Sequence, residues 1–197
     1  MIERIANAIV DQMENENLLY SEMKEHYLYA LITTIEKWLT VISILCIGVI
    51  FKQVVPIMLF LVFFLSLRKR TGGFHADSFL QCYLGTMVIS VAIIHVCPVL
   101  VNHMYVIYVL LACSVLVTSI IGTVNHPNLS MNCIELRESK KAARYLLGLQ
   151  CMILLAAIAL DISELFICYM SVAIILCAFL LCLAKLLKQE VCLHEKE

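Results

Sequence analysis

The chain has 197 residues, of which 62% are hydrophobic and 15% are charged, and its formal net charge is −1. Its mean hydropathy is +0.95. Ordinary soluble domains contain about 45–50% apolar and about 25% charged residues, so this composition excludes that class. The charges gather in a few patches between apolar runs. We therefore expect an all-α polytopic membrane protein with room for about six transmembrane helices.

Residues 1–37 are expected to form an amphipathic cytoplasmic or interfacial segment before the first span. One apolar stripe at helical spacing comprises Ile2, Ile5, Ile9 and Met13, and a second comprises Tyr20, Met23, Tyr27 and Leu31. Such stripes lie in a membrane interface or pack on other helices. The same pattern also fits docking of an amphipathic partner helix. Anchoring is the favoured interpretation, and docking is the alternative.

Residues 38–187 are expected to form the transmembrane domain. Four apolar runs are long enough, or nearly so, to cross a bilayer alone: Phe79 to Leu100, Met104 to Val124, Tyr145 to Leu160 and Leu165 to Leu183. The run from Leu39 to Leu67 is different, because Lys52 and Gln53 divide it. We expect a tight helical hairpin there. The alternative is one tilted span with a lysine near its middle, which costs about 2.5–3.5 kcal/mol on insertion scales.

The basic residues predict the orientation in the membrane. With six spans, Lys52 alone among the 14 lysines and arginines lies on one side, and all the others lie on the opposite side. By the positive-inside rule, the populated side is cytoplasmic. Both termini, the loops 68–77 and 125–144 and the tail 188–197 are therefore expected in the cytoplasm. The outer connections are too short to hold a site, so we expect function at the cytoplasmic face.

A histidine and a thiol lie seven residues apart at the mouth of the expected third span. Ser78 to Gln81 match the capping box S-x-x-Q, which predicts a helix that begins at Ser78, with Cys82 at its fourth position. A thiol there lies at the positive end of the helix dipole, which favours the thiolate. The basic run from Arg68 to Arg70 adds positive potential nearby.

The distance between His75 and Cys82 depends on where this helix begins. In one continuous helix their Cα atoms would stand about 10.5 Å apart along the axis, too far for a hydrogen bond. If His75 instead lies in the preceding loop, Gly72 and Gly73 give that loop the freedom to fold the imidazole over the first turn. A cysteine nucleophile with a histidine base is then feasible. The alternative is an interfacial loop histidine beside one more membrane cysteine.

The other cysteines carry no such signal. Seven of them fall inside apolar runs, where a cysteine acts as a small hydrophobic residue: Cys46, Cys97, Cys113, Cys151, Cys168, Cys177 and Cys182. The sequence contains no C-x-x-C pair and no Cys/His group with zinc spacing. We expect neither a metal site nor a cofactor.

The pattern R-x(4)-G-x-H-A-x(5)-C is filled here by Arg68, Gly73, His75, Ala76 and Cys82. In a polytopic chain of this size it resembles the accessory gene regulator B family of bacterial quorum-sensing systems. The resemblance extends over the amphipathic N-terminus, the two short spans and the basic loop before the fifth span. It implies a multi-pass protein of the bacterial cell membrane.

The same resemblance implies an activity. In that family the protein is a membrane-embedded cysteine endopeptidase that trims a small precursor peptide and helps to close it into a thiolactone or lactone. Cys82 would be the nucleophile and His75 its base, with Arg68 and Gly73 as supporting positions. No third, orienting residue stands out, although Asp77 and Glu135 are available.

The implied partners are a small amphipathic precursor peptide, the lipid bilayer and, as a further candidate, a second copy of the chain; nucleic acid is not expected. The main alternative function is a non-catalytic transporter or exporter of a peptide. Transporters usually show buried ionisable residues or broken helices near the midplane. Here the apolar interior offers chiefly His95 beside Pro98.

Overall fold

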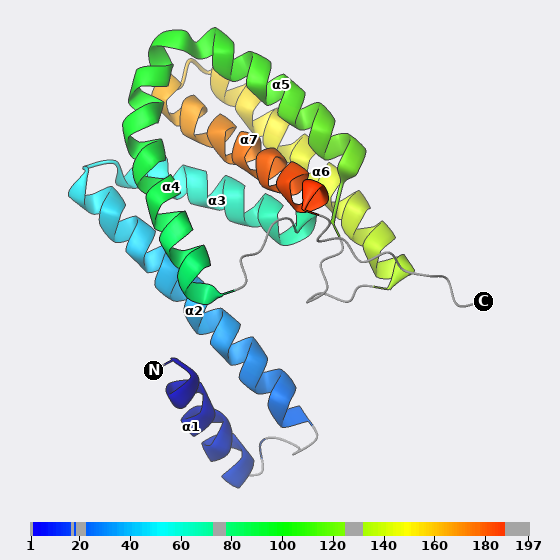
Figure 1. Cartoon of the computed structure of the whole chain (residues 1–197). Helices are drawn as coiled ribbons and strands as arrows, with labels where there is room; N and C mark the ends of the chain where they lie inside the picture. Colours follow the sequence, from blue (N-terminus) through cyan, green and yellow to red (C-terminus); the bar gives the residue numbers. More distant parts are fainter. Residues whose placement is uncertain (1, 17, 19–22, 73–77, 125–131, 188–197) are drawn as a thin grey trace.

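The fold is that of a computed structural model, which describes residues 2–16, 18, 23–72, 78–124 and 132–187. Every element within these residues is helical, which confirms the predicted all-α class. The elements are α1 (Ile2–Asn15), α2 (Lys24–Ile50), α3 (Val54–Thr71), α4 (Phe79–Leu100), the 3-10 turn η2 (Val101–His103), α5 (Met104–Ile121), α6 (Cys133–Ala159) and α7 (Glu164–Leu186) (Figure 1).

Four helical stretches of the described chain are long and apolar enough to cross a membrane. They are Lys24–Ile50, Phe79–Ile121, Ile134–Ala159 and Glu164–Leu186. Phe79–Ile121 has 43 residues and comprises both α4 and α5, joined by η2. α3 is not among the four, and its 18 residues include the basic run Arg68 to Arg70. Six crossings remain a prediction.

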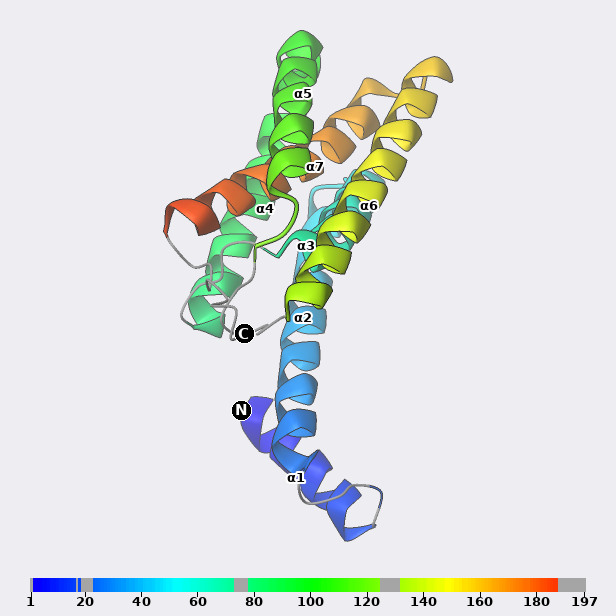
Figure 2. The ribbon, with the colours of Figure 1, turned by 90° about the vertical axis from the view of Figure 1, so that its right-hand side faces the viewer.

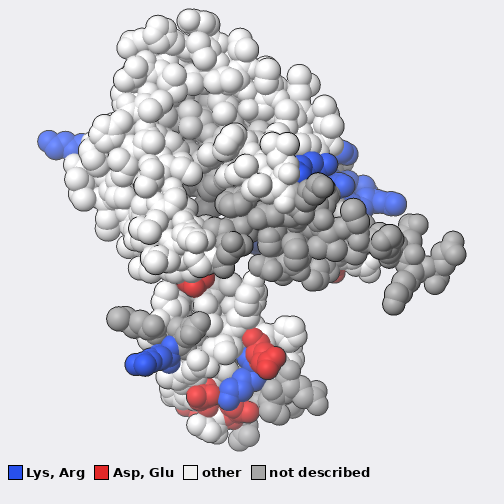
Figure 3. All heavy atoms as spheres, in the orientation of Figure 1, with Lys and Arg blue, Asp and Glu red and all other residues white. Residues whose placement is uncertain are grey.

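The surface agrees with a largely apolar environment. In Figure 3, the broad surface over α4, α5 and the middle of α7 carries no Lys, Arg, Asp or Glu, and the charged side chains gather on the part formed by α1 and the start of α2 and at the margins. A bilayer accepts such an uncharged surface, because apolar side chains lose nothing there by being uncovered.

The predicted hairpin at Lys52 is present as two helices. α2 ends at Ile50 and α3 begins at Val54. Lys52 has φ +56°, the left-handed conformation that ends a helix and turns the chain. The N–H of Gln53 donates to the carbonyl of Gly48 over 2.8 Å and satisfies one of the last carbonyl groups of α2. The alternative of one continuous tilted helix from Leu39 to Leu67 is therefore excluded.

The two helices of this hairpin approach closely. A Cβ atom at Gly48 would lie 3.4 Å from the Cβ of Ile57 on α3, which is an ordinary contact distance, so Gly48 stands directly against Ile57. At the tip, the hydroxyl of Tyr169 donates to the side-chain oxygen of Gln53. This bond ties the hairpin tip to α7.

At the other end of α2, α1 packs against its first turns, and together they project from the bundle (Figures 1 and 2). Ala6 and Val10 are the buried residues of α1, whereas Ile5 and Ile9 are exposed. Two of the four residues of the predicted apolar stripe, Ile5 and Ile9, therefore face outward. α2 runs without a break past residue 37, where we expected the N-terminal segment to end; the position at which the membrane begins along α2 stays a prediction.

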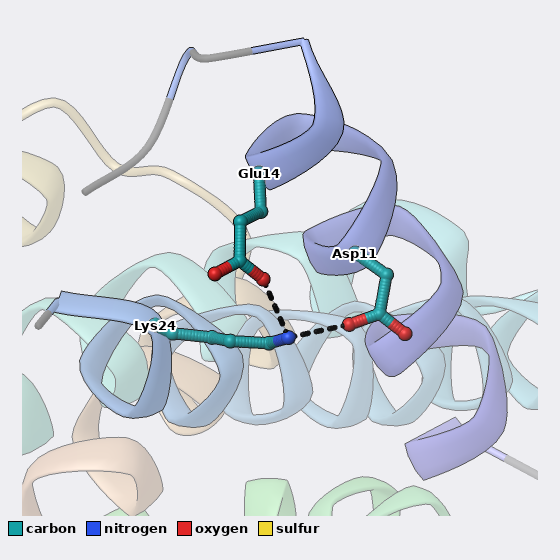
Figure 4. A network of polar contacts seen from close by, with 3 residues as sticks. All are labelled: Asp11, Glu14 and Lys24. Carbon is teal, nitrogen blue, oxygen red and sulfur yellow. Dashed lines mark hydrogen bonds and ion pairs between the residues drawn. The ribbon is translucent and has the colours of Figure 1, made fainter. Parts of the chain in front are cut away.

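An ion-pair network joins the two helices of this projecting pair (Figure 4). The Nζ of Lys24 at the start of α2 lies 2.7 Å from Asp11 Oδ1 and 2.7 Å from Glu14 Oε2, both on α1. One cation thereby bridges two carboxylates one turn apart, and fixes the side of α1 that faces α2. Exposed ion pairs contribute little to stability, so the network acts mainly on orientation.

α7 is the central helix of the bundle and packs most extensively against α3 and α5 (Figure 1). Its buried residues include Tyr169, Ile174 and Leu181. α6 joins the other side of α3 through Gln150, whose Nε2 donates to the carbonyl of Phe63 over 2.9 Å and lies 3.1 Å from Ser66 Oγ. Polar bonds between helices of this kind fix their register in an apolar setting.

The C-terminal end of α3 is bonded to two distant segments, which we call the α3 clamp. Thr123 Oγ1 donates to the Arg70 carbonyl over 2.9 Å, and Ser139 Oγ donates to the same carbonyl over 3.1 Å. The N–H of Val124 donates to the Thr71 carbonyl over 3.0 Å. These bonds satisfy carbonyl groups that have no partner within the helix.

The clamp predicts a strict requirement for glycine at position 72. Gly72 has φ +66°, and an added Cβ would lie 2.9 Å from the Val124 carbonyl oxygen. We expect Gly72→Ala to lower the free energy of unfolding by about 1–3 kcal/mol, measured as thermal unfolding in detergent.

The control is Gly148→Ala in α6, where an added Cβ meets no atom within 4 Å. That substitution should stabilise the helix by about 0.5–1 kcal/mol. A midpoint for Gly72→Ala equal to or above the wild type would contradict the proposed strain.

Candidate functional site

The predicted start of the helix that carries Cys82 is confirmed. Ser78 precedes α4, and its Oγ accepts a hydrogen bond from the N–H of Gln81 over 3.4 Å. The N–H of Cys82 donates to the Ser78 carbonyl over 3.1 Å. α4 begins at Phe79, so Cys82 is its fourth residue and its side chain is exposed. The thiol therefore stands within the first turn, near the positive end of the helix.

Cys82 borders a cavity of about 640 Å³ between α2, α3, α4 and α7. The walls are mainly apolar, and each helix contributes: Ile44 from α2, Phe60 and Phe64 from α3, and Phe179 from α7. A cavity of about 300–1,000 Å³ is typical of small-ligand sites. Among the cysteines that the structure describes, Cys82 alone borders this space.

Basic side chains border the same cavity. Arg68, Lys69 and Arg70 come from the end of α3 and Lys37 from α2, and no aspartate or glutamate is among the described residues that line it. The guanidinium of Arg68 donates to the Gly72 carbonyl. These four cations give the mouth a positive potential, which attracts anionic groups.

The positions of the lining residues along α3 and α4 show how far the cavity extends from its mouth. Along α3, Phe60 lies about 12 Å from Arg68, and along α4, Ile89 lies about 10.5 Å from Cys82, at 1.5 Å rise per residue. All four residues line the cavity. The space therefore extends from a basic mouth, where the thiol stands, along apolar walls into the bundle.

The predicted site residues divide into two groups. Cys82 and Arg68 border one cavity, whereas His75 and Gly73 lie outside the described residues, as does Asp77. Gly72 lines the cavity, and α4 begins just after Ser78. The chain on each side of residues 73–77 is thus at the site, and contact between His75 and Cys82 stays a prediction.

Glu135, considered in the sequence as a third residue, has a structural role. Its Oε2 accepts a hydrogen bond from the N–H of Asn132 over 2.9 Å, in the capping box that starts α6. Lys37 was not predicted as a site residue and was expected in the segment before the transmembrane domain. No sequence motif marks it, because its place at the cavity depends on how α2 packs.

The other described cysteines differ in burial. Cys97, Cys168 and Cys177 are buried, which confirms core filling for these three, and Cys151 and Cys182 are partly buried. Cys46 and Cys113 are exposed on the bundle surface, so core filling was wrong for these two. In the part of the chain that is described, no group of three His, Cys, Asp or Glu side chains could hold a metal ion.

The model of the accessory gene regulator B family matches residues 2–184. The chain belongs to this family. The family assignment made from Arg68 to Cys82 is thereby confirmed, and the match extends over nearly the whole chain.

Two curated relatives come from Clostridium perfringens. The chain is 32% identical to "Putative AgrB-like protein 2" of strain 13 / Type A over 93 residues, which are 47% of this chain and 44% of the relative. It is 31% identical to "Putative AgrB-like protein" of strain SM101 / Type A over 93 residues, with the same coverage. The matches thus span less than half the length of these relatives. No solved structure matches the chain.

Proposed function

We propose that this chain is a membrane-embedded cysteine endopeptidase. It cleaves a small precursor peptide through a thioester on Cys82 and promotes closure of the peptide into a thiolactone or lactone signal. The observation that carries the proposal is the place of Cys82: an exposed thiol in the first turn of α4, at the basic mouth of an apolar cavity. Family membership supports peptide processing as the role.

The first step forms the acyl-enzyme. His75 accepts the proton of Cys82, and the thiolate attacks the carbonyl carbon of the scissile peptide bond. The tetrahedral intermediate collapses with cleavage of the C–N bond, and His75 returns the proton to the departing amine. The C-terminal fragment leaves, and the N-terminal part remains bound to Cys82 as a thioester.

The second step releases the ring. A thiol or hydroxyl within the bound peptide gives its proton to His75 and attacks the thioester carbonyl. The C–S bond then breaks, and the Cys82 sulfur takes the proton back from His75. Water attacking instead would give a linear product. The apolar walls around the cavity disfavour water and so favour ring closure.

The exposed face of α1 fits a role in holding the precursor. Ile5 and Ile9 are exposed, while Ala6 and Val10 make the contact with α2. An amphipathic peptide at the membrane surface presents a complementary apolar face. Holding it beside the bundle would raise its local concentration near Cys82.

The proposal places the protein in the bacterial cell membrane with six spans, α2 to α7, and both termini in the cytoplasm. The supporting observations are the distribution of lysine and arginine and the four long apolar helical stretches. The mouth of the cavity then opens on the cytoplasmic side, where a newly made precursor arrives.

The nucleophile is tested by substitution at Cys82. With the precursor encoded next to its gene co-expressed and the products followed by mass spectrometry, Cys82→Ala should abolish cleavage. The cost in stability should be no more than about 0.5 kcal/mol, because the Cys82 side chain is exposed and its loss leaves no buried cavity. His75→Ala should reduce cleavage nearly as much, since an unassisted thiol attacks an amide poorly. Cys82→Ser should retain at most trace activity.

Matched controls are Cys46→Ala and Cys113→Ala, because both thiols are exposed and neither borders the cavity. Each should process the precursor at a rate close to that of the wild type. Cleavage by Cys82→Ala, or a thioester adduct on another cysteine, would disprove the assignment and favour a peptide transporter.

The orientation is tested by labelling intact cells. In a cysteine-free background, Gln53→Cys, Asn102→Cys and Ser163→Cys should each react with a membrane-impermeant maleimide, because these positions are expected outside. Ser139→Cys should react only after the cells are opened. External labelling of Ser139→Cys would overturn six spans and move the cavity mouth to the wrong side.

The α1 face is tested by the double substitution Ile5→Ser and Ile9→Ser. It should slow processing several-fold while leaving the amount of protein in the membrane unchanged, since neither side chain is buried. Ile134→Ser on α6 is the control, because Ile134 is also exposed. Processing at the wild-type rate would indicate that α1 serves anchoring alone.

A further inference from the structure

Gly85 lies one turn beyond Cys82 on α4 and borders the same cavity. A Cβ added at this position would meet no atom within 4 Å. Residues three and four apart share a face of a helix, and Cys82, Thr86 and Ile89 on that face all line the cavity. The missing side chain of Gly85 therefore leaves open space directly beside the thiol.

The hydroxyl groups near this space are already used. Thr86 Oγ1 donates to the Cys82 carbonyl over 2.7 Å, and Ser90 Oγ donates to the Thr86 carbonyl over 2.8 Å. Both hydroxyl hydrogens are thus spent on the backbone of α4. A group bound against α4 therefore does not need to accept a hydrogen bond from either hydroxyl group.

Beyond its basic mouth, the cavity has largely apolar walls. Phe64 and Leu65 line the cavity from α3, and Phe179 and Leu180 line it from α7. Burying a polar group against such walls without a partner is unfavourable, whereas an apolar side chain gains free energy there. An occupant of this part of the cavity is therefore apolar.

The chemistry at Cys82 decides which peptide residue occupies the space. In the thioester, the acyl carbon is bonded to the sulfur of Cys82, and the Cα of the same residue is one bond further. Its side chain must then lie within a few ångströms of the thiol. Gly85 stands about 4.5 Å further along the helix axis, within reach of that side chain.

We propose that Gly85 determines substrate specificity: it opens a pocket for a bulky apolar side chain on the residue immediately before the scissile bond. The proposal rests on the proposed role of Cys82 as nucleophile. A larger residue at position 85 would fill the pocket and shift the preference to peptides with a small residue there.

The pocket is tested first without any peptide. In a Cys46→Ala, Cys113→Ala background, the protein is labelled with N-methylmaleimide or with N-phenylmaleimide, which differ in the size of an apolar group. The rate at Cys82 is read by mass spectrometry of the peptide that contains it, because other cysteines remain. Gly85→Leu should lower the rate with the phenyl reagent, relative to the methyl reagent, by about tenfold. Gly85→Ala should give a smaller change in the same direction and guards against misfolding of the leucine variant.

Gly148→Leu is the matched control, since Gly148 is also open on a helix and does not line the cavity. Its ratio of the two rates should equal that of the wild type. Equal slowing of both reagents by Gly85→Leu, or no change in the ratio for either Gly85 variant, would overturn the pocket.

The second test uses two precursors, one with phenylalanine and one with alanine before the scissile bond. The wild type should process the phenylalanine form faster, and Gly85→Leu should lower the ratio of the two rates by about tenfold. An unchanged ratio, with Cys82→Ala inactive, would disprove the pocket and leave the endopeptidase intact. Cleavage by Cys82→Ala would instead disprove the proposed function, whatever the labelling rates show.

Discussion

The arrangement of the site depends on hydrogen bonds to the last turn of α3. Thr123 and Ser139 donate to the carbonyl of Arg70, and the N–H of Val124 donates to the carbonyl of Thr71. In a mostly apolar chain, a carbonyl at a helix end needs a partner from the protein. Here the partners come from the segment after α5 and from α6. The bonds thereby fix the basic run of α3 and the starting point of residues 73–77.

The cavity combines two environments that favour different parts of a peptide. Its mouth carries Arg68 and Lys37 beside the thiol, whereas its depth is lined by side chains such as Phe60 and Phe179. A charged or polar segment can remain at the mouth, and an apolar one can enter the bundle. Such a division would orient the peptide of the proposed function, because the reverse orientation would bury polar groups against apolar walls.

Local signals in the sequence predicted much of the fold. The helix start at Ser78 and the hairpin at Lys52 follow from capping and charge, which act over a few residues. The position of Lys37 at the cavity did not follow, because it depends on how α2 packs against α3 and α4. The outward direction of Ile5 did not follow either, because it depends on how α1 packs against α2. The site was predicted in part: Cys82 and Arg68 do border one cavity, while the place of His75 stays a prediction.

α2 links two parts of the molecule that differ in their surroundings. It begins at Lys24, where it is bonded to α1, and it reaches the cavity at Lys37, about 20 Å along a single unbroken helix. A continuous helix transmits a tilt along its length as a rigid lever. A movement that tilts α1 relative to the bundle would therefore displace one wall of the cavity and change its width.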